Sequence, residues 1–549
     1  MKISEEYMPK IVEVMKDYNK EQFGKDVVAG IIVAIIALPL SIALALASGV
    51  SPEQGLYTAI FAGFVIAALG GSRVQISGPT AAFATIVAGI VATKGITGLA
   101  TATVMAGIIL ILMGIFKFGY LIKFIPYTIV TGFTSGIAVT IIIGQIKDFM
   151  GLTFESSPIE TIEKIEETIA TLGTTNFVAL GVGILSLIVL VVWPKINAKI
   201  PASLIAVLVG IAVVKLGKLD VNTIGSLYEI SNKLPTPSLP SFNYELVRDL
   251  LPDAFTIAIL AAIESLLSSV VSDGMIGDRH NPNAELIAQG AGNITAAVFG
   301  GIPATGAIAR TAANVKNGGR SPISGMVHSI VLVLILVVLM PYAALIPMPT
   351  IAAILFVVAY NMSEWREFVS LIKKAPKSDT LVLVVTFVLT IAFDLVVAIE
   401  IGLLLAAILL IKRMSEVAEV KEWTYDILGN TNLRKVPKGV LVYEVVGPMF
   451  FAAADKIMSV YQDKNTKAII LRMRNVPAMD MSALRKLEEL QRACERRGII
   501  LIFSHVPEQP MKVMEKSGFT ETVGSRNFCM HIDDALLRAE KFCVKNNER

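Results

Sequence analysis

The chain has 549 residues, of which 54% are hydrophobic and 17% are charged. A soluble protein carries about 25% charged residues, so the composition excludes water as the solvent for most of this chain. The net charge of +3 is small and no basic-aromatic patch occurs, which argues against nucleic acid as a partner.

Apolar runs dominate the chain after its first 24 residues. Residues 1–24 mix Lys, Glu, Asp and Tyr without the apolar core of a signal peptide, so we expect a cytoplasmic N-terminal segment. Between 25 and 413, runs approaching the roughly 20 residues that cross a bilayer recur, which predicts a transmembrane transport domain with about fourteen spans. The expected spans are 26–48, 55–70, 79–94, 97–116, 120–145, 175–193, 201–215, 251–273, 283–300, 309–319, 323–343, 346–361, 379–395 and 396–413. With the N-terminus inside, twelve basic residues near the span ends fall on the cytoplasmic side, which places both termini in the cytoplasm: Lys117, Lys123, Lys195, Lys199, Arg279, Lys316, Arg320, Arg366, Lys373, Lys374, Lys412 and Arg413.

Two segments interrupted by Gly and Pro share one pattern. Residues 70–82 and 300–314 each begin with two glycines, continue with a stretch that reads as extended, and end in a helix of small residues. An Ile-Pro step, at 125–126 and at 346–347, follows each. Interrupted helices at matching positions of two halves are typical of transporter repeats, although Gly and Pro are also common in membrane helices generally.

The two halves hold about seven spans each, an odd number, so the repeats are expected to be inverted in the membrane. We expect short strands at 73–77 and 304–308 near the midplane. Non-helical backbone at that depth must be paired or line a cavity, and these strands can pair with each other. The fold class is therefore an all-α polytopic membrane protein, a seven-plus-seven inverted repeat with two short mid-membrane strands.

The helices after these strands would start at mid-membrane with their N-termini facing one another. Each start has unpaired N–H groups and about half a positive charge, which favours a small anion. Pro79 sits where a helix-start proline is expected. For Arg310 two interpretations stay open: a cation at the site, or a structural residue that is bonded to helix-end carbonyls or held in a water-filled cleft. We expect Ser77, Thr80 and Thr311 to donate hydroxyl hydrogen bonds to an oxyanion. We expect the small residues Gly78 and Ala309 to let that anion approach the backbone.

Glu264 lies in the middle of the span 251–273. A charged residue at a helix centre costs about 2.5–3.5 kcal/mol on insertion scales, so it usually has a function or a partner. Ser268 lies four residues later, on the same helical face. One interpretation is a coupling site, in which the carboxyl carries a proton or binds Na⁺ together with Ser268. The other is a permanent structural pair with Arg310.

The composition becomes that of a soluble protein after residue 413. We expect a linker at 414–437 and a cytoplasmic α/β domain at 438–549, with strands at 440–446, 468–473 and 499–503 and a helix at 484–497. Its three cysteines lack metal-ligand spacing and suit a reducing compartment. This domain shows no catalytic triad, phosphate-binding loop or metal cluster, so we expect no enzyme activity, no catalytic residue, no metal site and no cofactor beyond a transported proton or Na⁺.

These motifs resemble the SulP family of anion transporters. The matching segments are Gln75–Thr80, Asn281–Leu286 with Gly290 and Asn293, and Gly300–Asn314. The resemblance implies a UraA-like fold in the cell membrane, a core domain that moves against a gate domain, a site between the third and tenth spans, and a homodimer. Family substrates include sulfate, bicarbonate, chloride and dicarboxylates. Leu44 stands where vertebrate relatives place an aromatic residue against the anion, and it completes the predicted substrate-binding set: Leu44, Ser77, Gly78, Pro79, Thr80, Ala309, Arg310 and Thr311.

The resemblance also bears on coupling. Sodium-dependent bicarbonate members carry Asp and Thr where this chain has Glu264 and Ser268, so proton symport is favoured over sodium symport. The predicted function is proton-coupled uptake of a sulfate-, bicarbonate- or dicarboxylate-class anion by an elevator-like movement. Alternatives are a sodium-coupled bicarbonate symporter, an uncoupled anion exchanger or channel, and a nucleobase permease on the same fold.

The C-terminal region resembles a STAS domain, which implies a cytosolic partner. Ser482 falls where anti-sigma-factor antagonists carry a phosphorylatable serine, and a phosphate there would change the electrostatics of a helix start. The alternative is that Ser482 only caps the N-terminus of the helix.

Overall fold

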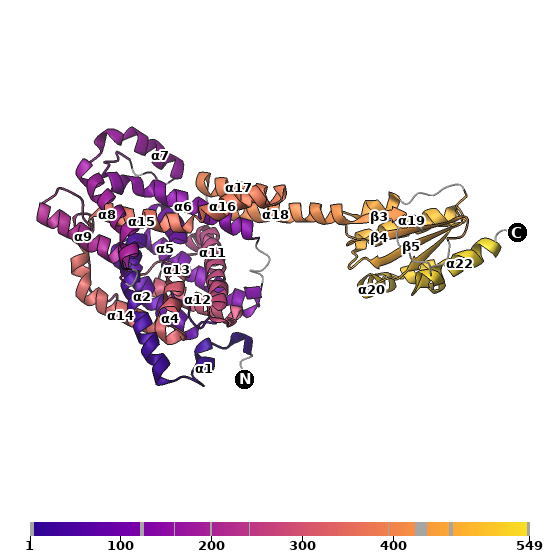
Figure 1. The fold of residues 1–549 in the computed structure, drawn as a ribbon, viewed down its shortest axis with the longest axis horizontal. Coiled ribbons are helices and arrows are strands. Elements are labelled where there is room, and N and C mark those ends of the chain that lie inside the picture. The colour runs from indigo at the N-terminus through magenta and orange to yellow at the C-terminus, as the bar shows by residue number, and fades with distance from the viewer. Residues whose placement is uncertain are drawn as a thin grey trace. The chain divides into compact units, whose positions relative to one another are not determined.

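The computed structural model describes residues 5–120, 126–156, 158, 160–197, 200–240, 242–393, 395–422, 436–459 and 465–545. The chain divides into two compact units, Met1–Leu403 and Leu404–Arg549. The first unit is helical and the second contains a β-sheet (Figure 1). Of the predicted features, Lys123 to Ile125, which include the first half of one Ile-Pro step, and most of the linker 414–437 lie outside the described residues.

The first half of the helical unit ends with α9, and a second half of similar order follows it. The first half consists of α2 (Lys20–Ala47), α3 (Pro52–Tyr57), η2 (Thr58–Ala62), α4 (Gly63–Leu69), β1 (Ser77–Gly78), η3 (Ala81–Phe83), α5 (Ala84–Ile115), α6 (Tyr127–Met150), α8 (Phe177–Ile196) and α9 (Ala202–Gly217). The second consists of α11 (Tyr244–Ile276), α12 (Pro282–Val298), β2 (Thr305–Gly306), α13 (Ile308–Lys316), α14 (Pro322–Ala343), α15 (Met348–Met362), α17 (Lys377–Ala392) and α18 (Leu395–Val417). Short helices α1 (Lys10–Val14), α7 (Thr161–Ala170), α10 (Ile224–Leu227) and α16 (Trp365–Lys374) connect or flank them.

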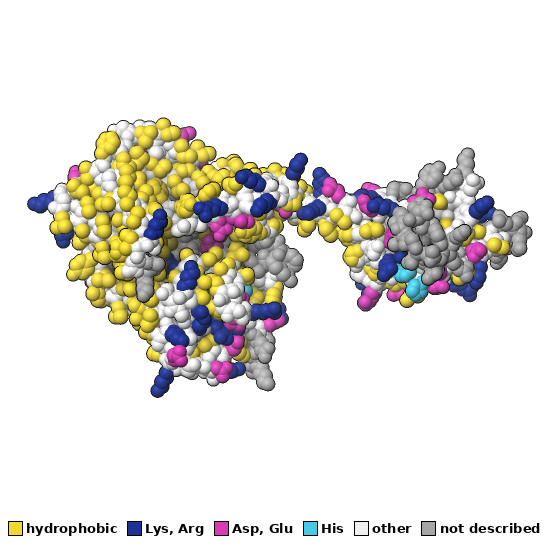
Figure 2. Space-filling model, in the orientation of Figure 1, with side chains coloured by type: hydrophobic (Ala, Val, Ile, Leu, Met, Phe, Trp, Pro, Cys, Tyr) yellow, Lys and Arg dark blue, Asp and Glu magenta, His cyan; other side chains and the backbone are white. Residues whose placement is uncertain are grey.

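Membrane-spanning character is clear in the described helices. Seven helical stretches are long and apolar enough to cross a bilayer, and α9 is a shorter apolar helix. Hydrophobic side chains cover much of the visible face of this unit, while charged ones gather near α1 (Figure 2). Apolar atoms facing outward are expected of a surface that lies in lipid. The prediction of fourteen spans stays a prediction.

Gly95 divides α5 in two. Its backbone has φ 69° and ψ −177°, so it interrupts the helical geometry between Ala84 and Ile115. Positive φ is accessible to glycine because it has no Cβ. The predicted spans 79–94 and 97–116 correspond to the two parts of this helix, which meet at Gly95.

The helices form two groups, each with members from both halves. In one group α5 packs against α11 and α12, and α2 packs against α14. In the other, α6 packs against α15 and α17, and α8 packs against α9 and α15. Small residues bring helices close: a Cβ added at Gly290 in α12 would lie 2.4 Å from the carbonyl oxygen of Gly107 in α5.

The second unit has a five-stranded sheet of order β3-β4-β5-β6-β7. The strands are β3 (Glu419–Glu422), β4 (Val440–Val446), β5 (Ala468–Asn475), β6 (Ile500–Ser504) and β7 (Phe528–Cys529); β3 is antiparallel to β4 and the other pairs are parallel. Successive residues of β5 join different apolar clusters, Leu471 with Leu487 of α19 (Met481–Arg496) and Ile470 with Leu536 of α22 (Ile532–Lys545). Such alternation buries both faces of a sheet under helices, which confirms the predicted α/β domain.

Candidate anion-binding site

The site is built around the crossing of β1 and β2. The two strands pair antiparallel, Ser77 with Gly306 and Gly78 with Thr305, which confirms the predicted pairing of short strands. The backbone N–H of Ala307 donates to the carbonyl oxygen of Ile76 at 2.9 Å. The regular strands are two residues long, shorter than the predicted stretches 73–77 and 304–308.

One helix begins after each strand. Thr80 has extended backbone angles, φ −126° and ψ 159°, and precedes η3, which leads into α5. Ala307 precedes α13. The expectation that Pro79 begins the helix is wrong, because the extended backbone of the crossing continues through Thr80. Pro79 therefore lies two residues before the first helical turn.

The α11 helix touches both of these helix starts. Thr80 Oγ1 donates to Glu264 Oε2 at 2.9 Å. One turn later, Ser268 Oγ donates to Thr311 Oγ1 at 3.4 Å. The predicted coupling residues therefore lie next to the predicted anion-binding residues, one beside each broken helix.

Ser77 and Thr311 hold the crossing together in this conformation. Ser77 Oγ accepts from Gln289 Nε2 at 3.2 Å, and Thr311 Oγ1 accepts from the N–H of Ile76 at 3.0 Å. Both side chains are buried. Of the predicted site residues, Thr80 and Glu264 are half-buried and Ala309 is exposed.

Arg310 lies buried beneath the crossing. Its Nη2 donates to the carbonyl oxygen of Pro79 at 3.3 Å, and among the described residues Nη1 has no hydrogen-bond partner. A Cβ at Gly78 would lie 2.7 Å from Nη1, so Gly78 leaves room for the guanidinium. No nitrogen of Arg310 lies within 4.0 Å of a carboxylate oxygen of the described residue Glu264, so the predicted structural pair between them is wrong for this conformation.

Leu44 is the predicted site residue that the structure leaves in an apolar setting. It lies in α2 with 4% of its side chain exposed, within the main apolar cluster. Its predicted role toward the anion stays a prediction.

A stripe of polar residues on α12 holds both strand segments, and we did not predict its function from the sequence. Glu285 accepts four hydrogen bonds: from the N–H groups of Gly71 and Ser72 at 2.9 and 3.1 Å, and from Gln75 and Gln289 at 2.7 and 2.8 Å. Two turns after Glu285, the side chain of Asn293 bonds both the N–H and the carbonyl of Ala304 at 2.8 and 2.9 Å. Glu285, Gln289 and Asn293 follow one another at intervals of four residues, which places them on one face of the helix. This spacing is the sequence signal from which their role could have been predicted.

Comparisons with known proteins agree with this architecture. The Sulfate permease family matches residues 23–386, and the STAS domain family matches residues 433–535. The chain belongs to the sulfate permease family. This confirms the predicted SulP family and the C-terminal STAS domain. Because the family consists of transporters, the chain is a multi-pass membrane transporter of the sulfate and bicarbonate anion class and not an enzyme, as predicted.

Individual relatives and solved structures are similar to this sulfate permease over most of its length. A protein of Bacillus subtilis, the putative sulfate transporter YvdB, is 40% identical over 94% of this chain and 98% of its own. The bicarbonate transporter BicA of Picosynechococcus is 30% identical over 96% of both chains. The structure of murine Slc26a9 in the inward-facing state superimposes with a TM-score of 0.88 over 97% of this chain and 94% of that one, at 20% sequence identity. The transmembrane domain of a cyanobacterial BicA superimposes with a TM-score of 0.63 over 71% of this chain and 98% of that one, at 28% sequence identity.

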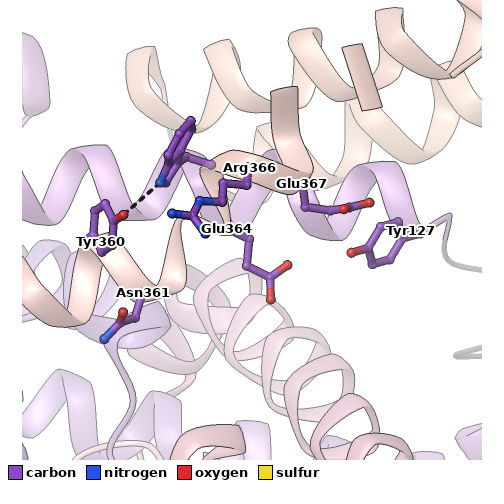
Figure 3. Close-up of a pocket in the computed structure, with 7 residues that line it drawn as sticks. Tyr127, Tyr360, Asn361, Glu364, Arg366 and Glu367 are labelled. Carbon is purple, nitrogen blue, oxygen red and sulfur yellow. Dashed lines mark hydrogen bonds between the residues drawn. The ribbon is translucent and has the colours of Figure 1, made fainter. Parts of the chain in front are cut away.

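A separate cavity of about 600 Å³ lies where α6 begins and α15 meets α16. Figure 3 shows the charged groups of Glu364, Arg366 and Glu367 between the rings of Tyr127 and Tyr360. None of the predicted site residues lines it. We therefore assign it no part in anion binding by this sulfate permease.

Ser482 does not cap α19. The helix is capped by Asp480, whose Oδ1 accepts from the N–H of Ala483 at 2.9 Å. The capping interpretation of Ser482 is therefore wrong, because the carboxylate two residues earlier already occupies that position. Ser482 lies exposed on the first turn, and its phosphorylation stays a prediction.

Proposed function

We propose that this sulfate permease is a secondary active transporter that carries a small anion together with a proton by an elevator-like movement. The anion belongs to the sulfate, bicarbonate or dicarboxylate class. Relatives named as sulfate and bicarbonate transporters support this class. The proposed location is the cell membrane, with both termini in the cytoplasm.

The starts of α5 and α13 are the proposed anion-binding elements. Unpaired N–H groups at a helix start and the helix dipole together attract negative charge. The two starts follow paired strands, so their separation is held by backbone hydrogen bonds. Arg310 beneath them adds a full positive charge at low exposure. This arrangement suits a small anion better than a nucleobase.

The contact between Thr80 and Glu264 is the observation that carries the proposal of coupling. An ionised Glu264 would repel an anion at the helix start that Thr80 precedes, whereas a protonated Glu264 would not. Anion binding and proton binding therefore favour each other, which is the thermodynamic requirement for symport. In the alternative coupling, Na⁺ would neutralise the same carboxylate.

An elevator-like movement is consistent with the two helix groups. The strands, both helix starts and Glu264 belong to the group that contains α2, α5, α11, α12, α13 and α14. Side chains of α11 and α12 bond directly to both strand segments and both helix starts. The site can then move as one body against the group that contains α6, α8, α9, α15 and α17.

The remaining organisation is also proposed. Residues 1–24 form a cytoplasmic segment, 25–413 the transport domain and 438–549 the STAS domain. The linker predicted at 414–437 is shorter than expected, because α18 continues to Val417 and β3 (Glu419–Glu422) pairs with β4 of the STAS sheet. We further propose a homodimer and a cytosolic partner of the STAS domain, with Ser482 as a regulatory position.

The test is an uptake screen in proteoliposomes with labelled sulfate, bicarbonate, succinate and, as a different substrate class, uracil. Each is measured with an inward proton gradient, with an inward sodium gradient and with neither. We expect one of the anions to accumulate only with the proton gradient. Accumulation driven by the sodium gradient alone would show that the coupling ion is Na⁺ and not a proton. Equal fluxes in all three conditions would indicate an uncoupled pathway. Uptake of uracil alone would refute anion transport.

A further inference from the structure

The C-terminal domain contains a cavity of about 290 Å³ beside the carboxyl ends of its parallel strands. Arg474 is the next-to-last residue of β5, His505 directly follows β6, and Phe528 and Cys529 form β7. In open sheets with parallel strands, ligands bind outside the carboxyl ends. The cavity lies within the second unit, so it is independent of the anion site in the membrane unit.

The walls of this cavity combine positive charge with apolar surface. Arg474 and His505 line it without any carboxylate, and Met511, Phe528 and Met530 supply apolar surface. Arg474 is exposed, and no ion pair joins it to another described residue of the domain. A cavity of this kind favours a ligand with a negative group and a small apolar portion.

Further basic groups surround His505. The ring of His531 packs edge-on against it, with centroids 5.2 Å apart (the histidines are cyan in Figure 2), and Arg472 lies nearby, paired with Glu444 at 3.4 Å. Burial, followed by the charges of Arg472, His531 and Arg474, lowers the pKa of His505. The acidic residues in the first turn of α22, Asp533 and Asp534, do not line the cavity.

The backbone of His505 is in the left-handed region, with φ 53°. Positive φ is uncommon outside glycine, although Asn, Asp and His adopt it more often than other residues, and surrounding contacts hold it in place here. The N–H of His505 donates to the carbonyl oxygen of Cys529 at 3.0 Å, and Nδ1 lies 3.0 Å from Ser504 Oγ. The ring is therefore held in place at the cavity wall, with Nε2 left as its second polar atom.

We propose that this cavity binds a small organic oxyanion, a carboxylate or a phosphate monoester, with Arg474 and His505 at the negative group and Phe528 and Met511 against the apolar portion. A cavity of about 290 Å³ is at the small end of ligand pockets, which suits a ligand of few carbon atoms. Binding of the anion stabilises the protonated form of His505, so binding strengthens as the pH falls.

The test uses the full-length protein in lipid nanodiscs and follows hydrogen–deuterium exchange of peptides that cover 504–507 and 528–531. The probes are glycerol 3-phosphate, succinate and inorganic phosphate, with glycerol and sodium chloride as controls, each compared with the ligand-free protein at about pH 6 and about pH 8. We expect glycerol 3-phosphate or succinate to slow exchange of both peptides several-fold, and more strongly at the lower pH.

Two variants and a matched control locate the effect. Arg474→Gln and His505→Asn should each abolish the protection, and Asn tolerates the positive φ at 505. Arg492→Gln, an exposed arginine of α19 outside the cavity, should keep it. The proposal is overturned if none of the probes protects these peptides, if sodium chloride or inorganic phosphate protects them as well as the organic anions do, or if Arg474→Gln retains the protection.

Discussion

Replacing Glu264 by Gln removes the charge of the carboxylate and keeps an oxygen that can accept from Thr80. Thr80 Oγ1 lies 2.9 Å from Glu264 Oε2. An anion held by one further hydrogen bond at this helix start lies about 5–6 Å from the carboxylate. At an effective dielectric constant of about 20, two unit charges at that separation repel by about 3 kcal/mol. Ionised Glu264 should therefore weaken anion binding by about two orders of magnitude relative to protonated Glu264.

The measurement has two parts. In nanodiscs, binding of the labelled anion identified by the uptake screen should weaken as the pH rises in the natural protein, because Glu264 ionises. In Glu264→Gln it should stay at the tight, low-pH level throughout. In proteoliposomes the variant should bind and exchange the anion but no longer accumulate it against its gradient when a proton gradient is imposed.

The matched control is Glu166→Gln, the same chemical change on the exposed surface of α7. It should leave both the pH dependence of binding and the accumulation unchanged. If Glu264→Gln still accumulates the anion in response to a proton gradient, or if its binding weakens with pH as in the natural protein, Glu264 is not the coupling group and the electrostatic reasoning fails.

Three further predictions concern other contacts. Thr80→Ala removes the hydrogen bond that Thr80 donates to Glu264, worth about 1.5 kcal/mol for an ionised acceptor, so anion binding in nanodiscs should weaken at a pH about one unit higher than in the natural protein, whereas Thr80→Ser should keep the natural pH dependence. In Gly71→Ala the new Cβ would lie 2.0 Å from the backbone oxygen of Asn281 at the start of α12, so we expect the variant to lose about 1–3 kcal/mol of stability. Its unfolding temperature, measured by size-exclusion chromatography after heating, should fall. The control Gly89→Ala, whose new Cβ would have no atom within 4 Å, should be nearly neutral. Because the pKa of His505 is lowered in the folded domain, the unfolded chain binds more protons below about pH 6.5, and proteolysis of the C-terminal domain should accelerate as the pH falls through that value. His505→Asn should flatten that dependence, and an unchanged pH profile would show that another group causes it.

Much of the fold was readable from local sequence. Apolar runs indicated membrane spans because each helix must satisfy its own backbone in lipid, and the repeated Gly-rich segments at 70–82 and 300–314 indicated two interrupted helices. Three strands of the C-terminal sheet, β4, β5 and β6, were predicted with similar bounds, because alternation of buried residues is a local property, whereas the edge strands β3 and β7 were not predicted.

The site was predicted less completely. The sequence by itself determined that Glu264 is an isolated charge in an apolar span and that Thr80 lies near a broken helix. Only the tertiary structure decided that these two residues, 184 positions apart, share a hydrogen bond, and that no ion pair joins Glu264 to Arg310 in this conformation. It also decided that Thr311 bonds the strand crossing and that Glu285 holds the loop before β1. Such partners depend on how helices distant in sequence pack, and a polar residue in an apolar span specifies the need for a partner without specifying which one.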